Sequence, residues 1–359
     1  MNILYDGKIF KNQKAGGINR YFAEIISALP ETWTPTILWA KTLGSNPPSH
    51  PRLRVSDPFE FRPRRFREAI DRKFRFKPAI ARADVLHPTY CELSNGMKLA
   101  DVTCPLVVTA HDFICAKYSH LIAGAVQVAR AQHEMMIRAD HIVCISKFTE
   151  QDLLERIPSA AGKTSVIHHG TSFEILEGVA SPQEATAFLF VGMRRGYKNF
   201  SFLLRAFAAA CTRHPGLTLK VAGAPFTEDE LWELHFLELS AKVVCVPYPD
   251  EAALNRLYRE SLALLYPSIH EGFGIPPLEA MACQTLAVTA NLTSLPEVVG
   301  NGGIMLDPFS EADWTECILQ IANAKVDREQ LLKNGTARVK QFSWKKSASE
   351  HVALYKSLA

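Results

Sequence analysis

Short apolar runs alternate with amphipathic stretches along almost the whole chain. In the first of these stretches, residues 18–29, Phe22, Ile25, Ile26 and Leu29 recur at helical spacing. The apolar runs predict buried strands at 2–5, 35–39, 84–89, 105–110, 141–146, 165–169, 187–193, 217–223, 242–247, 263–268, 286–290 and 303–307. Strands that alternate with helices in this way indicate α/β architecture, with parallel sheets covered on both faces.

The alternation is interrupted once, in a stretch of small and polar residues from 172 to 187 that is typical of a linker. A chain of 359 residues also exceeds the size of one comfortable core. We therefore predict two doubly wound, Rossmann-like domains, at 1–172 and 186–340, that face each other across a cleft. A C-terminal helix at 341–359 is expected to pack back on the first domain. Ligands of such sheets bind at the carboxyl ends of the strands.

Composition adds little to this fold class but excludes several kinds of protein. Hydrophobic residues make up 47% and charged residues 21%, which is ordinary for a globular chain, and the net charge is only +3. The eight cysteines stand singly, which favours reduced thiols over a disulfide framework or a structural zinc site. We see neither a signal peptide nor a run long enough to span a membrane. The sequence therefore predicts a cytoplasmic protein.

The stretch "EGFGIPPLEA" (271–280) places two glutamates eight positions apart, around glycines and a Pro-Pro pair. Prolines are tolerated in the first turn of a helix, so the loop leads from a strand end into a helix. Gly272 and Gly274 allow close approach of a ligand, and the free amides of the helix start favour a phosphate. Glu279 could accept hydrogen bonds from a ribose, and Glu271 from a second polyol. Phosphate, ribose and sugar together describe a nucleotide-sugar.

The longer stretch "YPSIHEGFGIPPLEAMACQTLAVTANLTSLPEVVGNGGIMLDP" (266–308) resembles the C-domain signature of retaining GT-B glycosyltransferases of family 4. The similarity covers most of the chain and is densest from 186 to 310. It implies that Glu271 lies at the donor sugar and that Glu279 holds the nucleotide ribose. Gly272, Phe273, Gly274 and Ile275 are expected to contact the donor. Gln284 and 286–287 depart from the family, which usually has a glycine and a proline there.

Cations gather after the first strand of the second domain, in "FVGMRRGYKNF" (190–200). Fixed cations that neutralise a departing diphosphate are an obvious device for glycosyl transfer. The family resemblance assigns this role to Arg194 and Lys198, and we expect Arg195 to contact the donor. Many relatives have an arginine directly after the glycine, where this chain has Met193. A solvated basic turn is the alternative reading.

Two stretches of the first domain carry further candidates. "VVTAHDF" places His111 and Asp112 at a strand end, and the resemblance implies a histidine near the donor sugar in this region. Asp112 could orient His111 or cap the next segment. Gly16 and Gly17 precede a helix, and the resemblance places this loop beside the acceptor and the donor phosphates, with Arg20 on the acceptor side. The spacing is not that of a dinucleotide fingerprint, which disfavours a nicotinamide oxidoreductase.

The sequence offers no convincing metal site. No D-x-D stands between a strand and a helix, and the acidic run 228–230 sits in a helical pattern that predicts a solvated face. With arginine, lysine and a helix terminus to meet the diphosphate, we expect no metal and no other cofactor. The family resemblance implies the same.

Basic residues concentrate in the segment 62–82, which carries nine of them against two acidic residues. Phe66, Ile70 and Phe74 follow each other at intervals of four, so the segment predicts a basic amphipathic helix. It could dock on an acidic membrane surface, or pack its Phe stripe inward under solvated arginines. Nucleic acid is disfavoured because no recognition motif accompanies the charge.

These observations predict a metal-independent, retaining hexosyltransferase that acts on a saccharide or lipid-linked acceptor in polysaccharide assembly. Resemblance to bacterial mannosyltransferases favours GDP-mannose as donor, with a UDP-sugar next. Docking of the segment 62–82 on the inner face of the membrane would suit a lipid-linked acceptor. Two alternatives stay open. One is a nucleotide-sugar epimerase or hydrolase of the same fold, and the other is a non-catalytic partner of another transferase, motivated by Met193 and Gln284.

Overall fold

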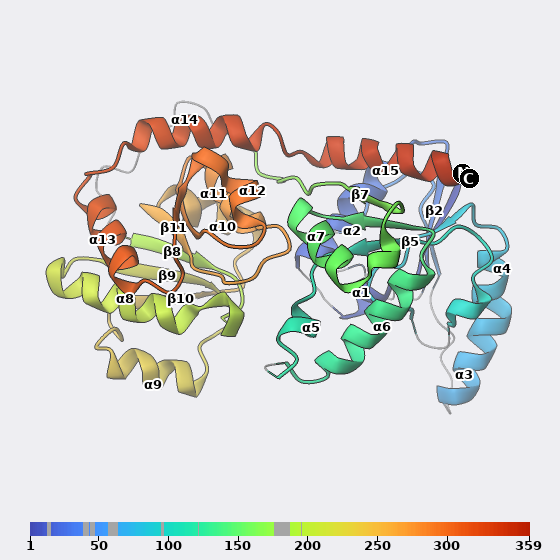
Figure 1. Cartoon of the computed structure of the whole chain (residues 1–359), viewed down its shortest axis with the longest axis horizontal. Helices are drawn as coiled ribbons and strands as arrows, with labels where there is room; N and C mark the ends of the chain where they lie inside the picture. The colour runs from blue at the N-terminus through green and yellow to red at the C-terminus, as the bar shows by residue number, and fades with distance from the viewer. Residues whose placement is uncertain are drawn as a thin grey trace. The chain divides into compact units, whose positions relative to one another are not determined.

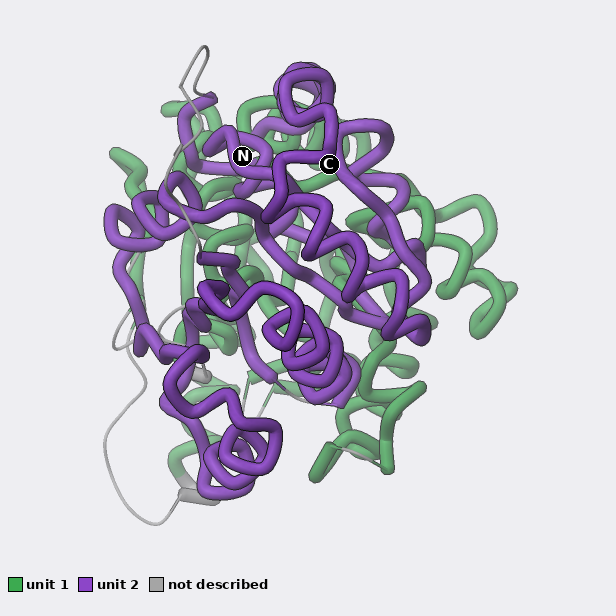
Figure 2. Tube along the Cα trace, turned by 90° about the vertical axis from the view of Figure 1, so that its left-hand side faces the viewer, with its two compact units in different colours: residues 1–170, 344–359 green, residues 171–343 purple. Residues whose placement is uncertain are grey.

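The computed structural model describes residues 1–12, 16–38, 43, 47–56, 64–94, 97–120, 122–175, 187–194 and 196–359. The chain divides into two compact units, shown in different colours in Figure 2. Unit 1 comprises residues 1–170 and 344–359, and unit 2 comprises 171–343. Most of the predicted linker, residues 176–186, lies outside the described residues.

Unit 1 is built on short parallel strands with helices between them (Figure 1). Its strands are β1 (Asn2–Tyr5), β2 (Thr34–Leu38), β3 (Arg54–Ser56), β4 (Val85–Leu86), β5 (Val107–Ala110), β6 (His141–Cys144) and β7 (Thr164–Val166). Its helices are α1 (Lys8–Asn12), α2 (Gly17–Ser27), α3 (Arg64–Asp71), α4 (Lys77–Ile80), α5 (Ile114–Lys117), α6 (Ala125–Arg138), α7 (Lys147–Arg156) and α15 (Trp344–Leu358), with the short turns η1 (Arg72–Phe76), η2 (Leu99–Asp101) and η3 (Pro158–Ala160).

Unit 2 repeats the same alternation. Its strands are β8 (Ala187–Val191), β9 (Thr218–Gly223), β10 (Val243–Pro247), β11 (Ala263–Tyr266), β12 (Leu286–Ala290) and β13 (Ile304–Leu306). Its helices are α8 (Phe200–Arg213), α9 (Glu228–Phe236), α10 (Glu251–Arg259), α11 (Ile275–Ala282), α12 (Leu295–Val299), α13 (Glu311–Ala322) and α14 (Arg328–Val339), with the 3-10 turns η4 (Gly196–Lys198) and η5 (Gly300–Gly302).

Every strand pair recorded among the described residues is parallel. Unit 2 has one six-stranded sheet in the order β10-β9-β8-β11-β12-β13. Unit 1 has the orders β3-β2-β1-β4 and β5-β6-β7, which a parallel bridge between Leu86 and Leu106 connects. Strand order reverses beside β1 and beside β8, so the carboxyl ends of these strands are switch points where ligands bind. The predicted α/β class with two Rossmann-like domains is confirmed.

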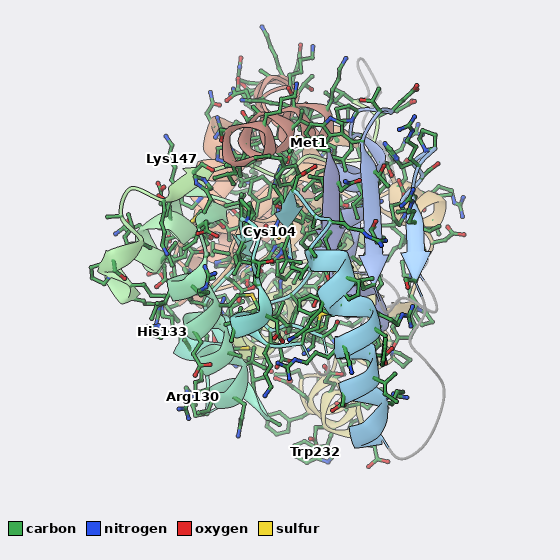
Figure 3. All side chains as sticks on the ribbon, turned by 90° about the vertical axis from the view of Figure 1, so that its right-hand side faces the viewer. Met1, Cys104, Arg130, His133, Lys147 and Trp232 are labelled. Carbon is green, nitrogen blue, oxygen red and sulfur yellow. The ribbon has the colours of Figure 1, made fainter. Side chains whose placement is uncertain are left out.

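Burial follows the predicted periodicities. All four residues of β5 and of β11 are buried, as expected for strands covered on both faces. Helix α6 is amphipathic instead, because it buries Met135 and Met136 and exposes Arg130 and His133. The two exposed residues are labelled in Figure 3, where they lie on the outer side of the helix. Strand β3 carries no apolar run and was missed by the pattern.

The basic segment is described only in part, and its described aromatic side chains face different ways. Its residues 62–63, and the side chains of 64–66 with Phe66, lie outside the described part. Phe74 is 61% exposed, whereas Phe76 and Ile80 are buried. The reason is the π-helical turn η1, because one extra residue in a turn advances the helix by about 100° and changes which face is buried. Asp101 binds Arg72 (2.5 Å) and Lys77 (3.4 Å), so these cations are paired rather than simply solvated.

The last helix, α15, belongs to the core of unit 1. Trp344 and Tyr355 join the apolar cluster that contains Ile3 and Phe22 from the start of the chain. His351 lies in the same core and binds the Tyr21 hydroxyl through Nε2 (2.7 Å). These contacts attach the final residues of the chain to β1 and α2.

Candidate functional site

The loop between β11 and α11 leads from the carboxyl edge of the sheet into a helix, as predicted from its prolines. Pro276 and Pro277 occupy the first turn of α11, and Gly274 is the residue before it. Gly274 has φ +114, and a Cβ at this position would lie 2.8 Å from Leu295 Cδ2. Only glycine meets both the positive φ and the lack of space for a Cβ at this position. The predicted first-turn position of Pro276 and Pro277 is confirmed.

The segment that follows β12 holds this loop in place. The Ser294 hydroxyl donates to the carbonyl oxygens of Glu271 (2.9 Å) and Phe273 (2.7 Å), and the Glu271 amide donates to Thr293 Oγ1 (3.1 Å). Glu271 is only 8% exposed. The loop backbone is thus fixed by hydrogen bonds, as a ligand-binding loop needs to be.

Glu271 and Lys198 form one cluster although 73 residues separate them. Lys198 Nζ donates to Glu271 Oε1 (2.6 Å) and to the Tyr266 hydroxyl (2.8 Å). Both charged side chains are 11% exposed. Lys198 closes η4 after β8, and Tyr266 ends β11, so the cluster stands at the switch point of the sheet. Burial and the neighbouring Glu271 raise the pKa of Tyr266 well above its usual value, so this hydroxyl keeps its proton.

Glu279 lies one turn into α11 and is 4% exposed. The Tyr258 hydroxyl, from the end of α10, donates to its Oε2 at 2.9 Å. Burial and Glu279 raise the pKa of Tyr258 far above its usual value. Tyr258 is therefore a permanent donor to this carboxylate. The structure thus places both glutamates at the start of α11, each beside a tyrosine that the sequence pattern did not reveal.

Arg194 has other partners than this cluster. Its guanidinium binds both Glu230 oxygens (2.7 and 2.9 Å) and the carbonyl oxygens of Ala224 and Pro225 (2.8 and 2.9 Å). Its side chain is 4% exposed. The expectation that 228–230 is a solvated run is wrong for Glu230, which also closes a capping box with Thr227 at the start of α9. The outer face of α9 carries Trp232 instead, 70% exposed and visible at the margin of Figure 3.

The role of Arg194 toward a diphosphate stays a prediction, although its observed contacts tie it to α9. Arg195 lies outside the described residues. Gln284 has φ +58, which accounts for the glycine usual at this position, and its side chain donates to Thr336 Oγ1 (2.6 Å).

His111 and Asp112 lie together in unit 1, where they line a pocket of about 60 Å³. The pocket is also lined by Ile18, Tyr90, Cys91, Thr109, Cys115, Val128 and Gln132. His111 Nε2 is buried and has no hydrogen-bond partner among the described residues. Burial lowers the pKa of His111 to about 3, so the imidazole is neutral at physiological pH. A neutral ring nitrogen without a protein partner is suited to bind a hydroxyl group.

The other predicted residues of unit 1 stand at the start of α2. Gly16 precedes the helix, Gly17 opens it, and both are exposed. Arg20 follows in the first turn and is half-buried. Ile18 from the same turn lines the pocket of His111, so α2 begins next to that pocket.

In the described part of the chain, no group of three or more His, Cys, Asp or Glu side chains is arranged to hold a metal ion. No helix there is both long and apolar enough to cross a membrane. All eight cysteines are free thiols.

The chain matches two protein families, one over each half. The family "Glycosyl transferases group 1" matches residues 172–338, and "Glycosyltransferase Family 4" matches residues 15–174. The O-antigen chain mannosyltransferase B of Escherichia coli is 30% identical over 275 residues, which cover 70% of each chain. A D-inositol 3-phosphate glycosyltransferase of Mycolicibacterium smegmatis is 28% identical over 70% of this chain and 61% of its own.

Solved structures agree on the fold. Sucrose-phosphate synthase from Thermosynechococcus elongatus has a TM-score of 0.77 at 24% identity, over 100% of this chain and 99% of its own. The Anabaena protein HepE, solved with UDP and glucose, has a TM-score of 0.71 at 16% identity, over 99% of each chain. The resemblance carried by the glutamate motif is confirmed. The chain belongs to glycosyltransferase family 4 and is a glycosyltransferase with the GT-B fold.

Proposed function

We propose that the protein transfers a hexose from a nucleoside-diphosphate sugar to a saccharide or lipid-linked saccharide, with retention of anomeric configuration. The observation that carries the proposal is the buried Glu271–Lys198 pair beside Glu279 at the start of α11. Such a cluster offers a cation and the positive end of the α11 dipole to phosphate, and carboxylates to hydroxyl groups.

Each group has one role in the proposed donor site. Lys198 neutralises the diphosphate as it departs, together with the positive end of the α11 dipole. Glu271 accepts hydrogen bonds from the transferred sugar, and Glu279 from the ribose. Tyr266 holds Lys198 at 2.8 Å and keeps its ammonium directed at the site.

Unit 1 carries the remaining proposed roles. Neutral His111 binds a hydroxyl of the donor sugar near the reacting carbon, and Asp112, which lines the same pocket, serves the acceptor side together with Arg20. In the transfer, the bond from the anomeric carbon to the phosphate oxygen breaks, and the acceptor oxygen bonds to that carbon on the same face. The departing phosphate takes the acceptor's proton, so no protein nucleophile is required.

We propose that the transfer needs no metal, because Lys198 and the positive end of the α11 dipole supply positive charge to the diphosphate. Turnover is expected to be unchanged in EDTA and without added magnesium. A loss of activity in EDTA that magnesium restores would refute this part of the proposal.

Two relatives bear on the identity of the donor. The similarity to a mannosyltransferase of O-antigen supports GDP-mannose and polysaccharide assembly, whereas the fold shared with UDP-bound HepE supports a UDP-sugar. We place GDP-mannose first. For location, we propose the cytoplasmic face of the membrane, since the described part of the basic segment exposes Phe74 (61%) beside the exposed Lys73.

A second candidate is a nucleotide-binding partner of another transferase that does not itself turn over. Its support is specific: Arg194 is bound by Glu230, and the exposed Met193 stands where many relatives have arginine. Such a protein would bind nucleotide, but mutation of Glu271 would change no measurable activity.

The test is calorimetric titration of the wild type with GDP, UDP and ADP, followed by turnover assays with GDP-mannose and UDP-glucose. We expect one nucleotide to bind, and Glu279→Ala to lose about 1–3 kcal/mol, as for a lost hydrogen bond to a charged group. Binding of none of the three would refute the donor site. Binding without transfer to mono- or oligosaccharide acceptors, with hydrolysis also absent, would favour the non-catalytic candidate.

A further inference from the structure

Tyr258 connects two helices of unit 2 beside the proposed nucleotide site. It is the penultimate residue of α10 and is fully buried. Its ring packs edge-on against Phe173, with the centroids 5.9 Å apart. Its carbonyl oxygen accepts hydrogen bonds from Thr285 Oγ1 (2.7 Å) and from the Ser261 amide (3.0 Å). Backbone and ring are therefore both held, and the hydroxyl has little freedom to move.

The Tyr258 hydroxyl contacts the carboxylate of Glu279, a charged residue at a buried helix position where an apolar side chain would pack without cost. Glu279 lies in a buried stretch of α11, between Leu278 and Ala280, and a buried carboxylate is strongly unfavourable unless it is well partnered. The Tyr258 hydroxyl provides a partner at 2.9 Å. Because the donor is neutral, it orients the carboxylate without cancelling its charge. The carboxylate therefore keeps its strength as an acceptor.

We propose that Tyr258 is a positioning residue for nucleotide recognition, which holds the Glu279 carboxylate in the orientation that receives the ribose hydroxyls. The inference rests on the proposed ribose role of Glu279 and goes beyond it. Tyr258 does not touch the nucleotide; it makes selection for ribose depend on a hydroxyl group of α10. Loss of this hydroxyl should leave the phosphate contacts intact and weaken only the discrimination between nucleotides with and without ribose hydroxyls.

The test compares each nucleoside diphosphate with its 2′,3′-dideoxy form, which lacks both hydroxyls. The probes are GDP, UDP and ADP with ddGDP, ddUDP and ddADP, titrated calorimetrically into the full chain. The wild type should prefer the ribose form by at least about 10-fold, the loss expected when charged-group hydrogen bonds are removed. Tyr258→Phe should lower this preference about 5-fold or more and leave the affinity for the dideoxy form unchanged.

Controls separate positioning from general stability. Tyr355→Phe removes another buried, hydrogen-bonded hydroxyl, in unit 1, and should leave the preference as in the wild type. Glu279→Ala should abolish the preference, and Tyr258→Phe should then have no further effect. Phe173→Leu keeps the Tyr258 hydroxyl but removes the ring that packs against Tyr258, so it should lower the preference for the ribose form by a smaller factor. If Tyr258→Phe fails to fold, this variant replaces it in the test.

Failure of the inference and failure of the proposed function give different results. Wild-type selectivity that disappears in Glu279→Ala but persists in Tyr258→Phe, or in Phe173→Leu where that variant carries the test, overturns the positioning role alone. A wild type that binds none of the six nucleotides overturns the proposed donor site and the inference with it. A lowered preference in Tyr258→Phe with an unchanged Tyr355→Phe supports the proposal.

Discussion

Replacing Glu271 with glutamine should make the protein bind nucleoside diphosphate more tightly while it loses turnover. Glu271 Oε1 lies 2.6 Å from Lys198 Nζ, so the carboxylate forms an ion pair with the cation that we assign to the diphosphate. A diphosphate that approaches Lys198 also approaches Glu271, and like charges repel. Glutamine keeps the shape of the side chain and removes the repulsion.

The magnitude follows from the geometry of the pair. A phosphate in contact with Nζ would stand roughly 5 Å from the Glu271 carboxylate, where two unit charges interact by about 3 kcal/mol at an effective dielectric constant of 20. Both side chains are 11% exposed, so solvent weakens this value only partly. With half of it realised, the diphosphate binds about 10-fold tighter. Turnover should fall by about 100-fold or more, because the sugar loses a charged hydrogen-bond acceptor.

The assay is calorimetric titration with the nucleoside diphosphate that the wild type prefers, together with steady-state transfer rates. Glu279→Gln is the matched comparison, because loss of this second carboxylate is expected to weaken binding of the same nucleotide. Thermal melting of both variants checks that the fold is retained. If Glu271→Gln binds the diphosphate equally or less tightly than the wild type, the phosphate does not lie beside this pair, and the proposed division of roles is wrong.

Three further predictions concern stability and the loop. Arg194→Ala should lower the unfolding free energy by about 3 kcal/mol, whereas Arg205→Ala, whose ion pair is half-exposed, should cost below about 1 kcal/mol; urea denaturation measures both, and equal losses would contradict the structural role. Gly274→Ala adds a clash to an unfavourable φ, so it should cost more stability than Gly162→Ala, which has φ +85 and open space, and it alone should weaken nucleotide binding. Burial lowers the pKa of His351 to about 4, so the unfolded chain takes up protons first and stability falls as pH drops below about 6.5; between pH 7 and 5.5 each such histidine should cost about 1 kcal/mol, and an unchanged urea midpoint would refute this.

Local patterns were sufficient for the architecture, because parallel strands buried on both faces are legible as short apolar runs. The glutamate motif was legible for a similar reason: glycines and prolines force a loop into a helix start, and this fixes where Glu271 and Glu279 lie. Strand β3 was missed since its residues 54–56 are largely exposed and carry no apolar run. The sequence left open whether the Phe stripe of the basic segment faces outward or inward; the structure exposes Phe74 and buries Phe76, because η1 interrupts the α-helical periodicity.

The partners of the site residues depend on contacts between distant segments, which periodicity does not report. Tyr258 and Tyr266 resemble ordinary core tyrosines in the sequence, and only the fold brings their hydroxyls to Glu279 and Lys198. Arg194 looked like a free cation because its partner Glu230 is 36 residues away. A possible signal was the Thr227–Glu230 capping pair, which indicates that α9 starts near the end of β9.

The location of α15 in unit 1 has a consequence for the order in which the protein can be made. Residues 171–343, which form unit 2, are synthesised before the helix that supplies Trp344, His351 and Tyr355 to the core of unit 1. The core of unit 1 therefore stays incomplete until the last helix has been made, whereas unit 2 needs nothing from that helix. A chain truncated after Ser343 should present a protease-sensitive first unit and a resistant second one.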